Sequence, residues 1–443
     1  QGTFWVNLPD FASSVDNIQI QRGVGTSTNG AGAFGASLNI QTTTRRDSAY
    51  AELNNSTGSF NTWKNTVSAG TGVISGKYSF DGRLSQIKSD GYIDRGSSDL
   101  KSFFLSGAYY GQKSLLRANV FSGSEKTYQA WNGVPENLLE SNRTYNGFTY
   151  DDQTDNYNQD HYQLLYSNAV SDKLTFNGAL HYTRGKGYYE EFREANDLVD
   201  YGIAPVVIGQ ETIAESDLVR RRWLSNHFYG LTYSLSYRPQ QRLNLTLGGA
   251  YNEYDGDHFG EVIWAQYAAT SSIRHRYYQG NGFKTDFNTY ARAEYELGAV
   301  GLFADLQVRR VGYAVTGTDK NRQTLDVNAD HLFFNPKFGV TYQINPRQNF
   351  YASFAVGNKE PNRDDFINSN PDNRPSHERL KNVEAGFRST SGTLSFGLNG
   401  FAMMYDDQLI LTGKINDVGE YIRQNVPDSY RLGLEGNARL QLL

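Results

Sequence analysis

Most of the chain consists of segments in which apolar and polar residues alternate. The alternation starts near Ser48, continues to the end of the sequence, and is clearest in residues 174–183, 243–252 and 432–442. A period of two gives a β-strand one apolar face and one polar face. The pattern predicts about 16 such strands between residues 48 and 443, and therefore an all-β fold.

The connections between these strands are of two lengths, which alternate along the chain. Short turns are expected at residues 73–76, 111–114, 171–173, 238–242, 298–300, 345–348 and 390–393. Long polar loops are expected at residues 124–156, 190–217, 255–282, 317–330, 358–377 and 408–419. Outer-membrane barrels have short turns on one rim and long loops on the other. The sequence therefore predicts a transmembrane antiparallel β-barrel with its long loops outside the cell.

Composition narrows the class of protein further. The 443 residues include 31 Tyr, 25 Phe and 44 Gly but no Cys, and the mean hydropathy is -0.60. Many aromatic residues together with a polar mean hydropathy are typical of strands that have one apolar face and one polar face. No apolar run is long enough for a transmembrane helix. A net charge of -5 without a basic block argues against nucleic acid as a partner, and the lack of cysteine excludes disulfides and thiolate metal sites.

The N-terminal part departs from this pattern in a glycine-rich stretch, residues 15–42. A strand is expected at residues 15–22, then a tight loop, then a strand at residues 38–42. Residues 30–35 also match GxGxxG, but dinucleotide binding requires a helix directly after that motif, and here the alternation continues. The nucleotide interpretation is therefore disfavoured. The residues expected to shape this stretch are Arg22, Gly23, Gly25, Gly30, Gly32, Gly35 and Asn39.

This stretch resembles the end of the plug domain in TonB-dependent outer-membrane receptors. The shared features are an Arg-Gly step at Arg22, a glycine-punctuated loop, and an Asn-Ile-x-Thr strand that starts at Asn39. Val24 and Ala36 depart from the family pattern. The similarity continues in residues 358–366, 377–386 and 425–436.

The resemblance implies two domains. Residues 1–46 would be the C-terminal part of a plug, and residues 47–443 a partial transmembrane barrel. Plugged barrels of this type have about 22 strands, so the chain would hold about 16 of them and would be truncated at both ends. Within such a barrel, Arg22 is expected to pair with an inward acid, Glu384 or Glu435.

No catalytic or metal-binding set is expected, and the chain is not expected to be an enzyme. The seven histidines are dispersed, HExxH is missing, and no Ser, His and Asp set stands out. The long loops instead carry aromatic residues and arginine, which suit an aromatic or anionic ligand. The candidate ligand-binding residues are Tyr128, Trp131, Tyr188, Tyr189, Trp264, Tyr267, Arg274, Arg276 and Tyr277.

The resemblance also implies active uptake of a scarce solute, most commonly a ferric siderophore, across the bacterial outer membrane. TonB, energised by ExbB and ExbD, would open the plug. The other expected partners are outer-membrane lipid and the small-molecule ligand, and no intrinsic cofactor is expected. Two alternatives stay open: a passive porin-like channel, since 16 strands can close one, and a TonB-dependent importer of the polysaccharide or cobalamin type.

Overall fold

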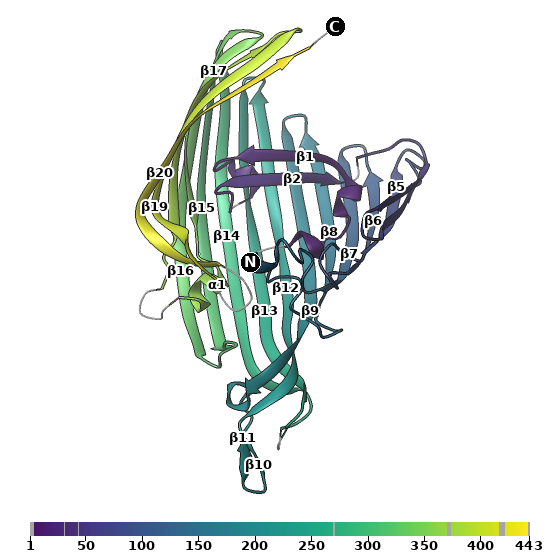
Figure 1. Ribbon diagram of the computed structural model, residues 1–443. Coiled ribbons are helices and arrows are strands. Elements are labelled where there is room, and N and C mark those ends of the chain that lie inside the picture. The colour runs from purple at the N-terminus through teal and green to yellow at the C-terminus, as the bar shows by residue number, and fades with distance from the viewer. Residues whose placement is uncertain are drawn as a thin grey trace.

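The computed structural model is built around one antiparallel sheet of 16 strands (Figure 1). It describes residues 4–30, 32–42, 44–268, 271–369, 374–415 and 421–441. Strands that follow one another in the sequence are neighbours in the sheet, in the order β3 to β9 and then β12 to β20. The sheet is strongly curved, and the hairpin of β1 and β2 lies across its concave side. The predicted all-β fold and the number of strands are confirmed.

The strands of the sheet are β3 (Tyr50–Gly58), β4 (Thr62–Gly70), β5 (Tyr78–Ser89), β6 (Ser98–Tyr110), β7 (Ser114–Tyr128), β8 (Thr154–Ser171), β9 (Leu174–Asp197), β12 (Glu215–Gln240), β13 (Leu243–Ala265), β14 (His275–Leu297), β15 (Val300–Thr318), β16 (Thr324–Asn345), β17 (Gln348–Lys359), β18 (Glu378–Thr390), β19 (Leu394–Ile415) and β20 (Tyr421–Leu440). Two hairpins stand apart from it: β1 (Val15–Arg22) with β2 (Ala36–Thr42), and β10 (Val206–Ile208) with β11 (Glu211–Ile213).

The helices are short. They are the 3-10 turns η1 (Trp5–Asn7), η2 (Phe11–Ser14), η3 (Ser27–Asn29), η4 (Glu136–Leu138) and η5 (Leu198–Tyr201), and the α-helix α1 (Arg363–Ile367). Among the described residues, no helix has the length and apolar character that a membrane crossing requires.

The two faces of the sheet differ in polarity, as β15 illustrates. Asp305, Gln307 and Arg309 are buried on the side that holds the N-terminal hairpin. Leu306 and Val308 alternate with them and are exposed on the other side. We call these sides the inner face and the outer face. An apolar outer face suits a membrane, because acyl chains rather than water then cover it.

The strands are longer than the alternation predicts. The short turns lie where they were expected, but the loops expected at residues 190–217, 255–282 and 317–330 are largely strand. A barrel strand crosses a membrane with about ten residues, whereas β9 has 24. Pairing continues past the apolar alternation because the hydrogen bonds between strands involve only the backbone. These three predicted loop boundaries were wrong.

The remaining long connections are mixed. Residues 129–153 form a loop between β7 and β8, close to the prediction. The connection from residue 360 to 377 contains α1, and residues 370–373 lie outside the described part. The loop expected at 408–419 is β19 up to Ile415, and its residues 416–419 also lie outside the described part.

The N-terminal segment, which we define as residues 4–42, contains the glycine-rich stretch. β1 and β2 pair antiparallel, with Ile18 opposite Ile40. Gly23, Gly25 and Gly30 have φ values of 76°, 61° and 105°, a region that favours glycine. The GxGxxG run is followed at once by β2. The helix that a dinucleotide would need is replaced by a strand, which rules out that interpretation.

Candidate functional site on the inner face

The inner face carries two groups of contacts that decide what the sheet can hold. One group fixes the N-terminal segment. The other lies at the loop end of the sheet, the end at which β10 and β11 project in Figure 1.

Ser27 fixes the loop between β1 and β2 to strands β15 and β16. Its backbone N–H donates to Asp305 Oδ2 at 2.8 Å, and its hydroxyl donates to Asp305 Oδ1 at 2.6 Å. Lys337 Nζ donates to the same hydroxyl at 2.6 Å and lies 4.0 Å from Asp305 Oδ1. Asp305 is fully buried. Because both charges are buried, each depends on these partners; we call the three residues the Ser27 anchor.

Asp10 fixes the start of the N-terminal segment to strands β4 and β5. Its carboxylate pairs with Lys64 at 2.6 Å and with Arg83 at 3.4 Å, and it accepts hydrogen bonds from the hydroxyls of Thr66 and Ser85. Burial raises the pKa of Asp10, but hydrogen bonds from Lys64 and the hydroxyl groups outweigh it, so the pKa is lower than its ordinary value. The group is therefore an anion at neutral pH; we call it the Asp10 anchor.

Arg22 makes a third contact, which differs in its exposure. Its Nη2 lies 2.7 Å from Glu435 Oε2, and the two side chains are 73% and 39% exposed. The expected pairing with Glu435 is confirmed, whereas Glu384 accepts a hydrogen bond from Asn382 at 2.8 Å. A Cβ on Gly23 would come within 3.2 Å of Glu384, so glycine permits the close approach here.

At the loop end, Arg222 is buried between two tyrosines that the sequence had singled out. Its Nε donates to the Tyr277 hydroxyl and its Nη1 to the Tyr189 hydroxyl, both at 3.2 Å. The ring of Trp131 stands edge-on to that of Tyr189, with centroids 5.4 Å apart. Guanidinium and phenol groups together can hydrogen-bond an anion and stack on an aromatic ring.

Arg220 extends this group towards η5. It donates to Glu191 at 2.7 Å and to the Tyr201 hydroxyl at 2.9 Å, and the Tyr201 ring stands edge-on to Tyr277 at 4.8 Å. Burial raises the pKa of Tyr201, although Arg220 opposes the shift, so this hydroxyl keeps its proton at neutral pH. The loop-end cluster comprises Tyr189, Glu191, Tyr201, Arg220, Arg222 and Tyr277.

Sequence reasoning missed Glu191, Arg220 and Arg222. The available signal was the run of three arginines at residues 220–222. In a strand, the first and third of three consecutive residues point to the same face, so this run places Arg220 and Arg222 side by side.

The other candidate ligand-binding residues lie elsewhere. Tyr188 packs on Trp223 with ring centroids 4.6 Å apart, on the face opposite to that of Tyr189. Arg276 lies over Phe259 at 4.1 Å, next to Trp223. Of the four further candidates, Tyr128 is buried, Tyr267 is half-buried, and Trp264 and Arg274 are exposed. The role of all nine in ligand binding stays a prediction.

Charged side chains also hold the connection after β17 against the inner face. Arg309 pairs with Asp286 and with Glu360, the latter at 2.8 Å, and Lys284 pairs with Glu360 as well. Burial raises the pKa of Glu360, but Arg309 and Lys284 bring it down to about 2. The described residues contain no group of three or more His, Asp or Glu side chains placed to hold a metal ion.

An apolar outer face and a polar inner face are typical of the wall of an outer-membrane β-barrel. In the described part of the chain β3 and β20 are the two edges of the sheet, so it forms part of such a wall, and the N-terminal segment lies across its inner face. The family model described as "TonB dependent receptor-like, beta-barrel" matches residues 109–443. The chain belongs to this family of outer-membrane receptors.

Solved structures with the same fold have little sequence in common with the chain. The ferric-catecholate import receptor Fiu of E. coli K12 is 14% identical with a TM-score of 0.69, over 95% of this chain and 66% of Fiu. The FrpB iron transporter of Neisseria meningitidis is 15% identical with a TM-score of 0.68, over 97% of this chain and 66% of FrpB.

The copper transporter OprC is 12% identical with a TM-score of 0.74, over 97% of this chain and 64% of OprC. The chain thus spans about two thirds of the length of these proteins. No match was found among curated proteins.

Proposed function

We propose that this chain takes part in the TonB-dependent uptake of a scarce metal complex across the outer membrane, and that this complex is a ferric siderophore or a similar iron complex. The observation that carries the proposal is the N-terminal segment, which lies across the inner face and is fixed by the Ser27 and Asp10 anchors. Its residues 15–42 are those that resemble a plug end. A segment in this position would obstruct free diffusion, so passage would require its displacement.

Displacement would require work, because the anchors are buried polar contacts. TonB, energised by ExbB and ExbD, would supply that work by pulling on the plug. Once the segment moves, water can replace Ser27 as the partner of Asp305 and Lys337. The cost is then that of exchanging hydrogen bonds, which is smaller than that of losing them. Buried polar anchors can therefore keep the N-terminal segment in place at rest and still allow it to be displaced by a pulling force.

The loop-end cluster suits an anionic, aromatic metal chelate. Its two arginines and three tyrosines offer charge-assisted hydrogen bonds and ring faces, and Fiu, one of the similar structures, is described as a ferric-catecholate receptor. OprC, with the same fold, is described as a copper transporter. The fold alone therefore does not select the metal, and the proposal of a siderophore rests on the cluster.

Uptake of radioactive iron as a catecholate chelate tests the proposal in cells that express the full-length receptor. Uptake is expected to need the receptor and to stop when TonB is deleted. Uptake that continues without TonB would indicate a passive channel. TonB-dependent import of cobalamin or an oligosaccharide, with no import of iron chelates, would establish the alternative ligand class.

Arg222→Gln tests the assignment of the ligand site. Loss of a hydrogen bond from a charged donor weakens an interaction by about 1.5–3 kcal/mol, so binding of the chelate should weaken about 10- to 100-fold. Arg310→Gln is the matched control, because Arg310 is an exposed residue paired with Asp330 on the outer face. Unchanged binding by the Arg222 variant would remove the cluster from the ligand site.

A further inference from the structure

The outer face of β5 to β9 changes its character in rows as it approaches the loop end. One row consists of paired neighbours on adjacent strands: Leu105 opposite Val120, Val120 opposite Tyr162, and Tyr162 opposite Tyr182. The rings of Tyr162 and Tyr182 stack with centroids 5.9 Å apart, and Leu105 is 51% exposed. An exposed apolar row with adjacent tyrosines is typical of the membrane interface.

On the same face the lysines lie four to six residues nearer the loop end than this row, and Arg184 lies two residues nearer, opposite Asp160. In one row Lys88 is opposite Asp99, and Asp99 is opposite Lys126. The next row towards the apolar row runs across four strands. In it Lys101 is opposite Ser124, Ser124 is opposite Asn158, and Asn158 is opposite Lys186. Four to six residues correspond to about 13–20 Å along a strand, and less along the membrane normal because barrel strands are tilted. These side chains therefore lie at the level of lipid headgroups.

The outer position of the lysines follows from their neighbours. Arg83 and Ser85 on β5 contact the N-terminal segment, and on β7 the ring of Phe121 packs against Phe11 of that segment at 5.4 Å. Lys88 and Lys126 have the opposite parity on these strands. They consequently face away from the lumen and from any solute that passes through it.

The cations of this surface outnumber its acids. The side chains of Lys88, Lys101 and Lys126 are 58%, 63% and 57% exposed. The first two share one carboxylate, that of Asp99, at 3.5 and 3.6 Å, and Lys126 lies 3.7 Å from Asp152. Arg184 and Lys186 add two further charges on β9, next to Asp160 on β8. The whole chain has a net charge of -5, so this surface is a local exception.

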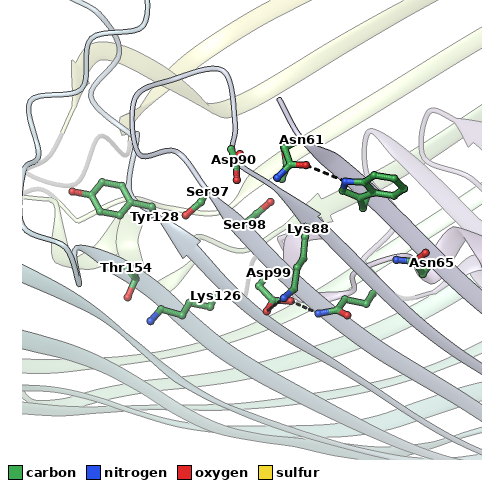
Figure 2. Close-up of a pocket in the computed structure, with 13 residues that line it drawn as sticks. Asn61, Asn65, Lys88, Asp90, Ser97, Ser98, Asp99, Lys126, Tyr128 and Thr154 are labelled. Carbon is green, nitrogen blue, oxygen red and sulfur yellow. Dashed lines mark hydrogen bonds and ion pairs between the residues drawn. The ribbon is translucent and has the colours of Figure 1, made fainter. Parts of the chain in front are cut away.

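The same side chains line two hollows in the outer face. One has a volume of about 480 Å³ and is lined by Trp63, Lys88, Asp99 and Lys126 among others; Figure 2 shows the last three on neighbouring strands. The other has a volume of about 560 Å³ and is lined by Lys101, Lys126, Arg184 and Lys186 together with Trp223. Lys186 Nζ lies 5.6 Å from the centre of the Trp223 ring.

We propose that this lysine surface, made of Lys88, Lys101, Lys126, Arg184 and Lys186, binds the phosphate-bearing headgroup of an outer-leaflet glycolipid. Its hollows receive the phosphates and sugars, and its cations neutralise them. The acyl chains of the same molecule lie against the apolar row at Leu105 and Tyr162. A soluble anion would use the cations alone, whereas a lipid uses both the cations and the apolar row that lies further from the loop end on the same face. The proposal does not depend on what the receptor transports.

The test uses the receptor in detergent and, as the probe, a bisphosphorylated diglucosamine glycolipid. Each lysine close to an anionic lipid surface contributes enough affinity for about a fivefold change. The triple variant Lys88→Gln, Lys101→Gln, Lys126→Gln should therefore bind the glycolipid at least ~10-fold more weakly than the wild type. The matched control removes the same charge at the short turns: Lys77→Gln, Lys113→Gln, Lys173→Gln. It should bind within about twofold of the wild type.

Two further ligands make the outcome decisive. The same glycolipid without its phosphates should bind the wild type as weakly as the phosphorylated form binds the triple variant. Equal binding of the two lipids, or an equal loss in the control variant, would overturn the proposal. So would pyrophosphate that binds as tightly as the lipid, because the surface would then be a soluble-anion site. If the triple variant fails to fold, Lys101→Gln alone should show about a fivefold loss, and an unchanged affinity would equally refute the lipid site.

Discussion

The Ser27 anchor and the Arg22 pair both join the N-terminal segment to the sheet, with shortest contacts of 2.6 Å and 2.7 Å. They differ in their surroundings: Asp305 is completely buried, whereas the Arg22 side chain is 73% exposed. An exposed pair is screened by water and contributes about 0–1 kcal/mol. Removing one member of a buried charge pair costs about 3–5 kcal/mol, because the other charge is left without a partner. Burial rather than distance therefore ranks these contacts.

Asp305→Ala should have the largest effect, since it leaves Lys337 buried without its counter-charge. We expect the N-terminal hairpin to open more easily by about 3 kcal/mol. Hydrogen exchange of the amides in residues 15–42 of the full-length receptor measures this opening. Asp330→Ala, which removes an exposed partner of Arg310, serves as the control. If the amides of both variants exchanged at the same rate, burial would not explain the difference in strength between the two contacts.

Replacing the whole buried pair sharpens the comparison. Asp305→Leu combined with Lys337→Met removes both charges, so much of the opening caused by Asp305→Ala should be reversed, because no buried charge is left unpaired. The same exchange measurement reports the recovery. A double variant at least as open as Asp305→Ala would mean that the hydrogen bonds of Ser27, and not charge burial, dominate.

Asp10→Asn should have an intermediate effect, since its hydroxyl partners can still bond to an amide while Lys64 and Arg83 lose a counter-charge. We expect about 1.5–3 kcal/mol at neutral pH. The pKa of Asp10 is lowered in the folded protein, so this contribution is fully present above the ordinary value of 3.8. It is lost as the pH falls through the lowered pKa. The exchange difference between wild type and variant should therefore be constant from pH 7 to about pH 5 and shrink at more acidic pH. A difference that grows with acidity would contradict this assignment.

Arg22→Ala should have the smallest effect, about 0–1 kcal/mol. Raising the salt concentration should reduce it further, because exposed charges are screened. Exchange in residues 15–42, measured in low and high salt, tests both points. An effect as large as that of Asp305→Ala would show that solvent exposure does not predict the strength of this ion pair.

The fold was predictable because its signals are local. Alternation with period two and polar turns gave the number of strands, and the short turns fell where the sequence placed them. The loop-side ends of β9, β13 and β15 were not predictable from this pattern, since pairing beyond the membrane needs no apolar face. The strand ends mattered for the site as well. Tyr188 and Tyr189 are adjacent, and only a strand that continues through both sends them to opposite faces.

The anchors were harder to predict than the fold. Arg22 attracted attention because a charged residue stands out in a glycine-rich loop. Ser27 lies in a Ser, Thr and Asn-rich turn, where a hydroxyl group is usually solvated, and its partner Asp305 lies 278 positions away in the sequence. A contact between such distant residues leaves no trace in local composition. The contact forms only because the fold places the loop between β1 and β2 next to β15 and β16.

The hairpin of β10 and β11 gives the molecule an insertion point. It projects beyond the rest of the loop end in Figure 1, pairs only Val206–Ile208 with Glu211–Ile213, and turns at Gly209, where a Cβ would meet nothing within 4 Å. An epitope placed after Gly209 would be displayed at the tip of this hairpin, away from the Ser27 and Asp10 anchors. Antibody labelling of intact cells could then report how much receptor reaches the cell surface, independently of whether a variant binds or transports anything.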